Sequence, residues 1–151
     1  MWNGCDVDEE AIGWLRKRGI SSAAKCNEVP PLPYPDECFD GVYAFSVLTH
    51  IHPKQHHSWY KEIFRVLKPQ GLALLTTQGD AILASGRIAD TEAIKRYREL
   101  GWCDVEQPGH YKNASLVNPK VTTDLAREYF DTVDYTPGGY QALMDQFIVR
   151  K

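Results

Sequence analysis

The densest group of chemically active side chains in the sequence is a set of histidines. His50 and His52 are followed by the adjacent pair His56 and His57. Imidazole rings bind metals and move protons near neutral pH. Adjacent residues on a helix point about 100° apart, and no cysteine or carboxylate lies at zinc-site spacing, so we predict no metal site. His50 follows a predicted buried strand and is a weak candidate for a general base or substrate contact; a structural or solvated histidine is the alternative.

Two carboxylates lie at the end of a short predicted strand near the N-terminus. A carboxylate at the carboxyl end of a parallel strand can accept two hydrogen bonds from a vicinal diol, and Asp6 fits that role. Asp8 precedes Glu9 and Glu10 and is better placed to cap a helix. We therefore assign diol binding to Asp6, with a plain helix-capping role as the alternative.

The elements that must position these residues alternate through the first half of the chain. The segment FDGVYAFSV (39–47) is apolar on both faces, as expected of a strand with helices packed on each side. The proline-rich segment at 30–35 predicts an extended connector. The alternation predicts an α/β fold with a parallel sheet. The expected strands are 2–7, 23–27, 39–47 and 72–77, and the expected helices are 9–18 and 54–67.

The second half has a different pattern. A helix over 91–100 should stop at Gly101, loops should lead to Pro119, and apolar residues then recur at helical spacing to Tyr129. Strands at 132–136 and 146–150 are joined by only a short link around Pro137. Because a parallel crossover needs a dozen or more residues, these strands should form an antiparallel pair.

Three segments, in their order and spacing, resemble one family. They are GCDVD (4–8), LPYPDECFD (32–40) and IFRVLKPQG (63–71). They are similar to the second strand, the approach to the fourth strand and the following turn of class I S-adenosylmethionine-dependent methyltransferases of the type 11/12 kind. The resemblance implies a single domain over 1–151 with a Rossmann-like α/β sheet, mostly parallel and ending in an antiparallel hairpin.

The same resemblance implies S-adenosylmethionine as cofactor and a set of residues that bind it. Asp6 would hold the ribose hydroxyls and Val7 would lie against the adenine. Glu28, beside Val29, would meet the adenine amino group, and Ser46 would contact the methionine portion. The alternatives are a core role for Val7, a solvated loop position for Glu28, and an ordinary strand end for Ser46.

One part of the family pattern has no counterpart in the sequence. Asp6 lies five residues after Met1, and no GxGxG loop follows a strand, so we expect the family's first strand, glycine loop and helix to be missing. Either the strand at 2–7 closes onto the strand at 39–47, or a partner chain fills the gap between them. The irregular region around His110 should lie over the substrate side.

Composition narrows the function classes. The 151 residues carry a net charge of −3 without a basic cluster, which gives no electrostatic footprint for nucleic acid. No leader is visible, and the aliphatic run at 72–75 is too short for a membrane span. Four cysteines without CxxC spacing are expected as reduced thiols in the cytoplasm.

These observations predict a methyltransferase enzyme that acts on an unidentified small molecule. The alternatives are a non-catalytic remnant of the fold that serves as a binding or assembly module and, less favoured, a nicotinamide-dependent oxidoreductase. The terminal hairpin and the absence of GxGxxG argue against the last. We expect a homo-oligomer that buries the region of residues 2–5, because the missing strand would leave apolar surface exposed.

Overall fold

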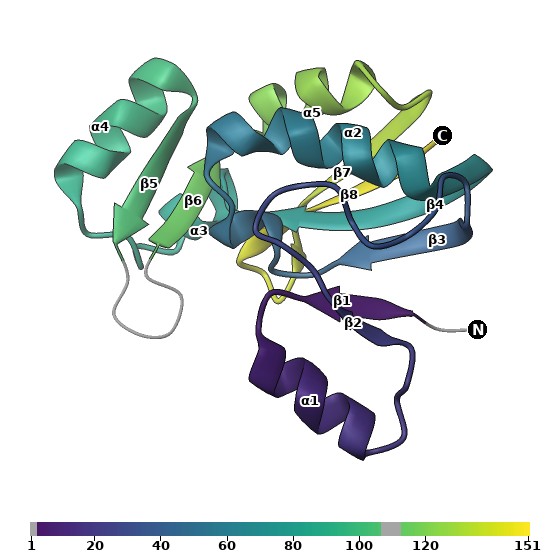
Figure 1. The fold of residues 1–151 in the computed structure, drawn as a ribbon. Coiled ribbons are helices and arrows are strands. Elements are labelled where there is room, and N and C mark those ends of the chain that lie inside the picture. The colour runs from purple at the N-terminus through teal and green to yellow at the C-terminus, as the bar shows by residue number, and fades with distance from the viewer. Residues whose placement is uncertain (1–2, 107–112) are drawn as a thin grey trace.

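Strands and helices alternate along the chain in the computed structural model, which describes residues 3–106 and 113–151 (Figure 1). The short 3-10 turns η1 (Leu48–His50) and η2 (Pro53–Gln55) precede α2. The strands are β1 (Gly4–Asp6), β2 (Ala23–Lys25), β3 (Phe39–Ala44), β4 (Leu67–Thr77), β5 (Trp102–Glu106), β6 (Asn113–Val117), β7 (Thr132–Tyr140) and β8 (Met144–Arg150). The helices are α1 (Glu9–Lys17), α2 (His56–Val66), α3 (Asp80–Ala84), α4 (Thr91–Leu100) and α5 (Pro119–Arg127).

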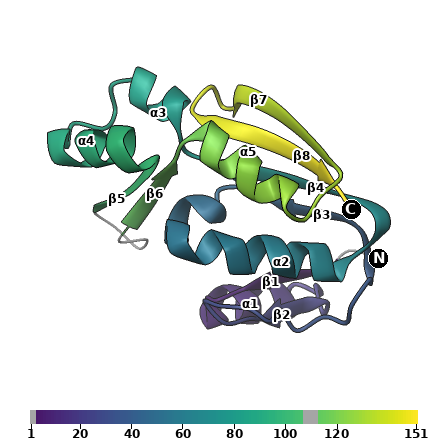
Figure 2. The same ribbon diagram turned by 90° about the horizontal axis from the view of Figure 1, so that it is seen from above.

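The main sheet has the strand order β3-β4-β8-β7. β3 and β4 are parallel, with Ala44 opposite Leu75, whereas β8 is antiparallel to both β4 and β7. The predicted parallel pair and the predicted terminal antiparallel pair are therefore confirmed. Figure 2 shows α2 and α5 together on one face of this sheet.

The main core lies between the sheet and these two helices. Leu75 of β4 and Phe147 and Val149 of β8 are fully buried against Tyr60 and Ile63 of α2. Tyr60 and Ile63 are three residues apart, so they share one face of α2, as the sequence predicted. Burial of this stripe fixes α2 on the sheet.

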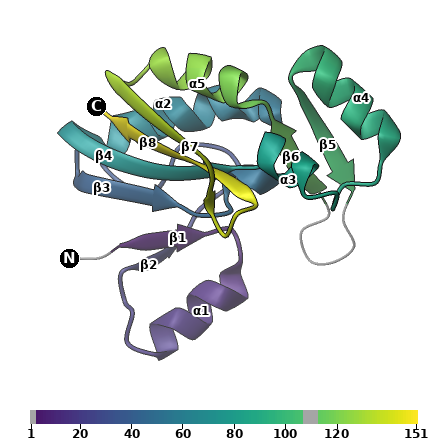
Figure 3. The ribbon, with the colours of Figure 1, turned by 180° about the vertical axis from the view of Figure 1, so that it is seen from behind.

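The N-terminal unit, comprising β1, α1 and β2 (residues 4–25), forms a sheet of its own. β1 and β2 pair in parallel, with Asp6 opposite Lys25. Asp8 caps α1 as predicted: its carboxylate accepts hydrogen bonds from the N–H groups of Glu10 and Ala11. Figure 3 shows β1 beyond β3 and running in the same direction, but the two strands belong to separate sheets. The chain thus does not close this strand onto the strand at Phe39.

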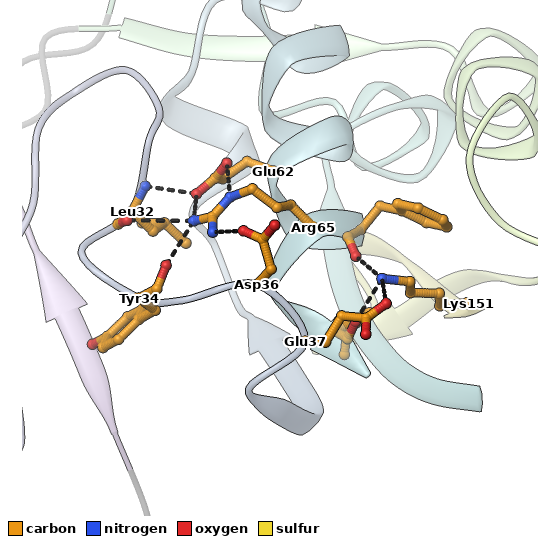
Figure 4. A network of polar contacts seen from close by, with 9 residues as sticks. Leu32, Tyr34, Asp36, Glu37, Glu62, Arg65 and Lys151 are labelled. Atoms are coloured by element: carbon orange, nitrogen blue, oxygen red, sulfur yellow. Dashed lines mark hydrogen bonds and ion pairs between the residues drawn. The ribbon is translucent and has the colours of Figure 1, made fainter. Parts of the chain in front are cut away.

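The proline-rich connector between β2 and β3 is tied to α2 by hydrogen bonds to the Glu62–Arg65 ion pair of that helix (Figure 4). The Glu62 side chain is 6% exposed and accepts hydrogen bonds from the backbone N–H of Leu32 and from Arg65. The Arg65 guanidinium also donates to the Tyr34 carbonyl, at 2.9 Å, and to the Asp36 carboxylate. These bonds satisfy the polar groups of a segment that has no ladder of its own.

A second hydrophobic core, formed by α3, α4, β5 and β6, lies to one side of the main sheet. Tyr97 of α4, Cys103 of β5 and Leu116 of β6 are buried in it. The predicted loop from 102 to 118 is wrong in its described part, since β5 and β6 form an antiparallel pair. Four of the five residues of β6 are buried, and packing in this second core stabilises both segments as strands. His110 lies outside the described residues.

The turn at residues 68–71, which lies within β4 before its pairing with β8, also differs from expectation. The residue types of this turn, with Pro69 second and Gly71 fourth, predict a type I turn. Gln70 instead has φ of +67°, which suits the third position of a type II turn. Gly71 is required next to it, because a Cβ there would lie 2.8 Å from the Lys68 carbonyl oxygen.

Among the described residues, no helix has the length and apolar character needed to span a bilayer.

Candidate functional site

The carboxyl end of β1 presents the candidate diol-binding residue. Asp6 is half-buried, and its Oδ1 accepts a hydrogen bond of 2.9 Å from the N–H of Asp8. This bond orients the carboxylate at the strand end, and a carboxylate has lone pairs for further donors. Val7 is 43% exposed beside it. The pair offers a hydrogen-bond acceptor next to an exposed apolar surface.

Glu28 and Val29 follow the neighbouring strand. β2 ends at Lys25 opposite Asp6, and the N–H of Cys26 donates to the Asp6 carbonyl at 2.9 Å. The chain therefore leaves both strands at the same end of the small sheet. Glu28 is exposed and Val29 is 47% exposed, so both are open to a ligand.

Ser46 lies just beyond β3 in a constrained conformation. Its φ is +54°, a region rarely adopted by residues other than glycine. Its N–H donates to Oγ1 of Thr76 at 2.8 Å, and its Oγ lies 3.2 Å from Oγ1 of Thr49. Both threonines are fully buried. The strained backbone is thus held by polar contacts with β4 and η1, a common arrangement at ligand sites.

His50 ends η1 close to Ser46 in the sequence. Its Nδ1 lies 3.0 Å from the carbonyl oxygen of Asn113 at the start of β6. A carbonyl oxygen only accepts, so Nδ1 carries the proton in this contact, and in the neutral ring Nε2 is then the basic nitrogen. This is the tautomer that a general base using Nε2 requires.

His52, His56 and His57 have structural contacts. His56 is buried, its Nε2 lies within 3.1 Å of the carbonyl oxygens of Leu48 and Ile51, and burial lowers its pKa. His52 contacts Asp104 of β5, whereas His57 lies beside Glu128 and Tyr129. Within 3–106 and 113–151, no three histidine, cysteine or acidic residues gather in a group that could hold a metal ion.

The predicted site residues thus form two groups at the carboxyl ends of parallel strands, which Figure 1 shows on the same side of the molecule. One group belongs to the N-terminal unit: Asp6, Val7, Glu28 and Val29. The other follows β3: Ser46 and His50. In open α/β sheets, ligands bind outside these strand ends.

Two features near the second group were not predicted. The ring of Tyr140, from the β7–β8 hairpin, stacks on Phe45 with centroids 5.1 Å apart. Asp145, opposite Thr77, is fully buried, and its Oδ1 accepts from the Tyr135 hydroxyl and the Gly138 N–H. Burial raises the pKa of this carboxyl. The sequence signal in this region was the polar pair Thr76–Thr77, which follows an apolar run and indicates the end of β4.

Comparison with known proteins gives a family match. Residues 2–75 match the family model described as a methyltransferase domain. A Mycolicibacterium smegmatis protein named "Probable S-adenosylmethionine-dependent methyltransferase" is 31% identical over 84 residues, which are 56% of this chain and 32% of that protein. A tRNA N(3)-cytidine methyltransferase of Gallus gallus is 39% identical over 69 residues, 46% of this chain and 19% of that protein. The chain thus spans a third or less of these relatives.

Among solved structures, the fold is similar to that of an S-adenosylmethionine-dependent methyltransferase from Methanosarcina mazei. The TM-score is 0.73 at 21% sequence identity, and the match covers 99% of this chain and 81% of the other. The sheet order, the terminal antiparallel pair and the family match over residues 2–75 all indicate the same methyltransferase fold. The chain belongs to the class I S-adenosylmethionine-dependent methyltransferases, whose cofactor is S-adenosylmethionine.

Proposed function

We propose that this chain is the cofactor-binding part of an enzyme that methylates a small molecule. The observation that carries the proposal is Asp6 at the carboxyl end of β1, oriented by the Asp8 N–H and next to the exposed side chain of Val7. A carboxylate beside an apolar surface suits a ribose next to a planar base. Glu28 and Val29, at the same end of the small sheet, supply an acceptor and a further apolar contact for the base.

Ser46 and His50 act on the other side of the proposed site. S-adenosylmethionine, when bound, supplies an electrophilic methyl group on a sulfonium. Ser46 offers a hydroxyl to its amino-acid portion. Nε2 of His50 accepts the proton that the acceptor loses, while the Asn113 carbonyl holds Nδ1–H and fixes the ring. Most of the rate enhancement then comes from alignment of the reactants.

Calorimetric titration tests cofactor binding. We expect S-adenosylmethionine and S-adenosylhomocysteine to bind and NAD not to bind. Asp6→Ala should weaken binding by about 1.5–3 kcal/mol, the usual contribution of a hydrogen bond to a charged group. Glu10→Ala, which removes an exposed acid from α1, is the matched control and should leave affinity unchanged. Unchanged affinity in Asp6→Ala would disprove the ribose role, and no binding at millimolar ligand would favour a non-catalytic module.

A methyl-transfer assay with a labelled donor tests the acceptor class. The net charge of −3 supports a small molecule over a nucleic acid. A panel of small amines, phenols and thiols should accept label, whereas tRNA, the substrate in the name of the Gallus gallus relative, should not. His50→Gln should slow transfer while cofactor affinity stays the same. Labelling of tRNA alone would overturn the small-molecule proposal.

We also propose a homo-oligomer that works in the cytoplasm. The face of the main sheet opposite α2 and α5 exposes Tyr43, Leu72 and Ile148, at 56%, 42% and 37%. Apolar surface of this kind tends to find partners. Four free cysteines support a reducing compartment. Sedimentation velocity at micromolar concentration should show a species larger than 17.2 kDa, and a single monomer would refute the oligomer.

A further inference from the structure

Two cysteines lie on neighbouring strands at the same end of the small N-terminal sheet. Cys5 lies in β1 opposite Ala24 of β2, and Cys26 is the second residue after Ala24. The ladder continues to this point, because the Cys26 N–H donates to the Asp6 carbonyl at 2.9 Å. Side chains two residues apart on a strand point to the same face, so the thiols of Cys5 and Cys26 share one face of the sheet.

The thiols are near neighbours, and a buried hydroxyl lies with them. Cys5 and Cys26 are both half-buried and act on each other's pKa. The Tyr34 hydroxyl is buried beside them. Its pKa is raised by burial, by its contact with the Cys5 thiol, and by the nearby thiols of Cys26 and Cys38. Thiol groups from three separate segments therefore meet around one tyrosine.

The spacing of the pair is wider than that of a relaxed disulfide. With strands about 4.8 Å apart and a rise of about 3.3 Å per residue, the Cα atoms of Cys5 and Cys26 are roughly 8 Å apart in an untwisted ladder. Disulfides span about 4.4–6.8 Å between Cα atoms. Bond formation must therefore draw the ends of β1 and β2 together. The small sheet can move, since Ile12 and Ala23 are its only fully buried apolar residues in the described structure.

We propose that Cys5 and Cys26 form a redox modification site that a peroxide converts to a disulfide. The thiolate of one cysteine attacks a peroxide oxygen, the O–O bond breaks, and a sulfenic acid and hydroxide form; the proton released when the thiol ionised converts the hydroxide to water. The second thiol then attacks the sulfenic sulfur, the S–O bond breaks, and the S–S bond and a second water form. Two thiols and one hydrogen peroxide thus give one disulfide and two waters.

The environment of the thiols sets the rate. Burial is the main cause that raises the pKa of Cys5, and burial with the neighbouring Cys5 raises that of Cys26 to about 12. The thiolate, which is the reactive form, is scarce at neutral pH. Oxidation should therefore be slow near pH 7 and faster in alkaline buffer. The stretched disulfide should be readily reduced again by a small thiol.

The pair is placed to control the candidate cofactor site. Asp6 and Val7 directly follow Cys5, and Glu28 follows Cys26 by two residues. Movement of both strand ends displaces the acceptor and the apolar surface together. If the proposed function holds, the disulfide form binds S-adenosylhomocysteine at least about tenfold more weakly, the loss expected when a charge-assisted hydrogen bond is misaligned.

The experiment follows bond formation and ligand binding separately. The full chain is treated with hydrogen peroxide at about pH 8.5, where more thiolate is present. Remaining thiols are blocked, and peptide mapping by mass spectrometry locates any disulfide. We expect a Cys5–Cys26 link that dithiothreitol reverses. Cys5→Ala and Cys26→Ala should each abolish it, and Cys38→Ala is the matched control that should retain it. Circular dichroism checks that each variant folds.

The outcomes separate this inference from the proposed function. A mapped Cys5–Cys26 link supports the redox site even if the reduced chain binds no S-adenosylhomocysteine, a result that would count against the proposed function alone. Absence of the link, a link to Cys38, or a link that persists in Cys26→Ala overturns the redox site. Unchanged S-adenosylhomocysteine affinity in the linked form overturns the control of binding.

Discussion

The N-terminal unit and the main sheet carry different halves of the candidate site and differ in how firmly they are built. The sheet packs Leu75, Phe147 and Val149 against α2, and all three are fully buried. The N-terminal unit has a three-residue strand pair, with Ile12 and Ala23 as its fully buried apolar residues in the described structure. The proposed adenosine contacts thus lie on the loosely packed part, and Ser46 and His50 lie on the firm part. Ligand-binding elements are often drawn from the less stable regions of a protein.

Core truncation in the two regions gives the largest expected contrast. Leu75→Ala should lower the free energy of unfolding by about 2–5 kcal/mol, because it removes a fully buried side chain and leaves a cavity. Leu100→Ala, at a position of α4 that is 57% exposed, is the control and should cost less than about 1 kcal/mol. Urea denaturation measures both.

The companion change in the N-terminal unit is Ile12→Ala. Hydrogen exchange should show faster opening of α1 while the amides of β4 keep their protection, because the unit opens locally. Equal loss of protection in β4 would show that the two regions unfold as one, and the contrast drawn above would fail.

The next largest effect should come from the Glu62–Arg65 ion pair of α2, to which the connector is hydrogen-bonded. Arg65→Ala leaves the buried Glu62 carboxylate without its partner, and we expect a loss of about 2–4 kcal/mol. Lys68→Ala is the matched control, because its pair with Asp40 is exposed and worth little. A loss no larger than that of the control would mean that the connector is held by other contacts.

The pH dependence of the same pair has a definite sign. Burial alone would raise the pKa of Glu62, but hydrogen bonds from Arg65 and from the Leu32 N–H outweigh it, so the pKa lies below the ordinary value of 4.5. The unfolded chain therefore takes up the proton first as pH falls. The stabilisation is present above pH 4.5 and is lost as pH falls through the pKa of the folded state. In Arg65→Ala this acid-dependent part of the stability should disappear.

Asp145 should show the opposite sign. Burial raises its pKa above the ordinary value of 3.8, so the folded state holds the proton where the unfolded chain has released it. Stability attributable to this group falls as pH rises through that window. Asp145→Asn, which cannot ionise, should be more stable than the natural chain by about 1 kcal/mol at pH 8, with a smaller difference at about pH 5. Thermal melts at both pH values check this, and a gain that shrinks as pH rises would contradict it.

The smallest expected effect concerns the cap of α1. Asp8→Ala removes the acceptor for the N–H groups of Glu10 and Ala11 and should cost about 1 kcal/mol. The loss should appear as faster hydrogen exchange in α1, with little change in β4. Asp8→Asn keeps a capping oxygen and should behave like the natural chain. A change in β4 equal to that in α1 would again indicate one cooperative unit.

Local sequence patterns predicted those elements whose buried faces are formed by residues close together in the sequence. The stripe of Tyr60 and Ile63 determines a helix face, and Asp8 is recognisable as a cap from its own position. The run at 39–47 does contain a strand, but it ends at Ala44 and none of its residues is buried, so the expectation of helices on both of its faces was wrong. The type of the turn at Gln70 was wrong because glutamine has no preference for the positive φ that it adopts there.

Features that depend on distant pairings could not be predicted in this way. Asp145 is buried because β8 pairs with β4 and brings it opposite Thr77. The β5–β6 hairpin is stabilised by packing on α4, and its strands are too polar to stand out alone. Whether β1 pairs with β3 depends on tertiary packing, so local patterns could not decide it. The two groups of candidate site residues could be named from the sequence, because each follows a predicted strand end. Their roles in binding remain predictions.

The second hydrophobic core, formed by α3, α4, β5 and β6, affects how the sequence can change during evolution. Its buried residues, among them Tyr97, Cys103 and Leu116, are distinct from those of the main core in the described structure. A substitution there requires compensation only from its own neighbours. Substitutions at Tyr97 or Leu116 should therefore leave the packing of Leu75, Phe147 and Val149 in the main core unchanged.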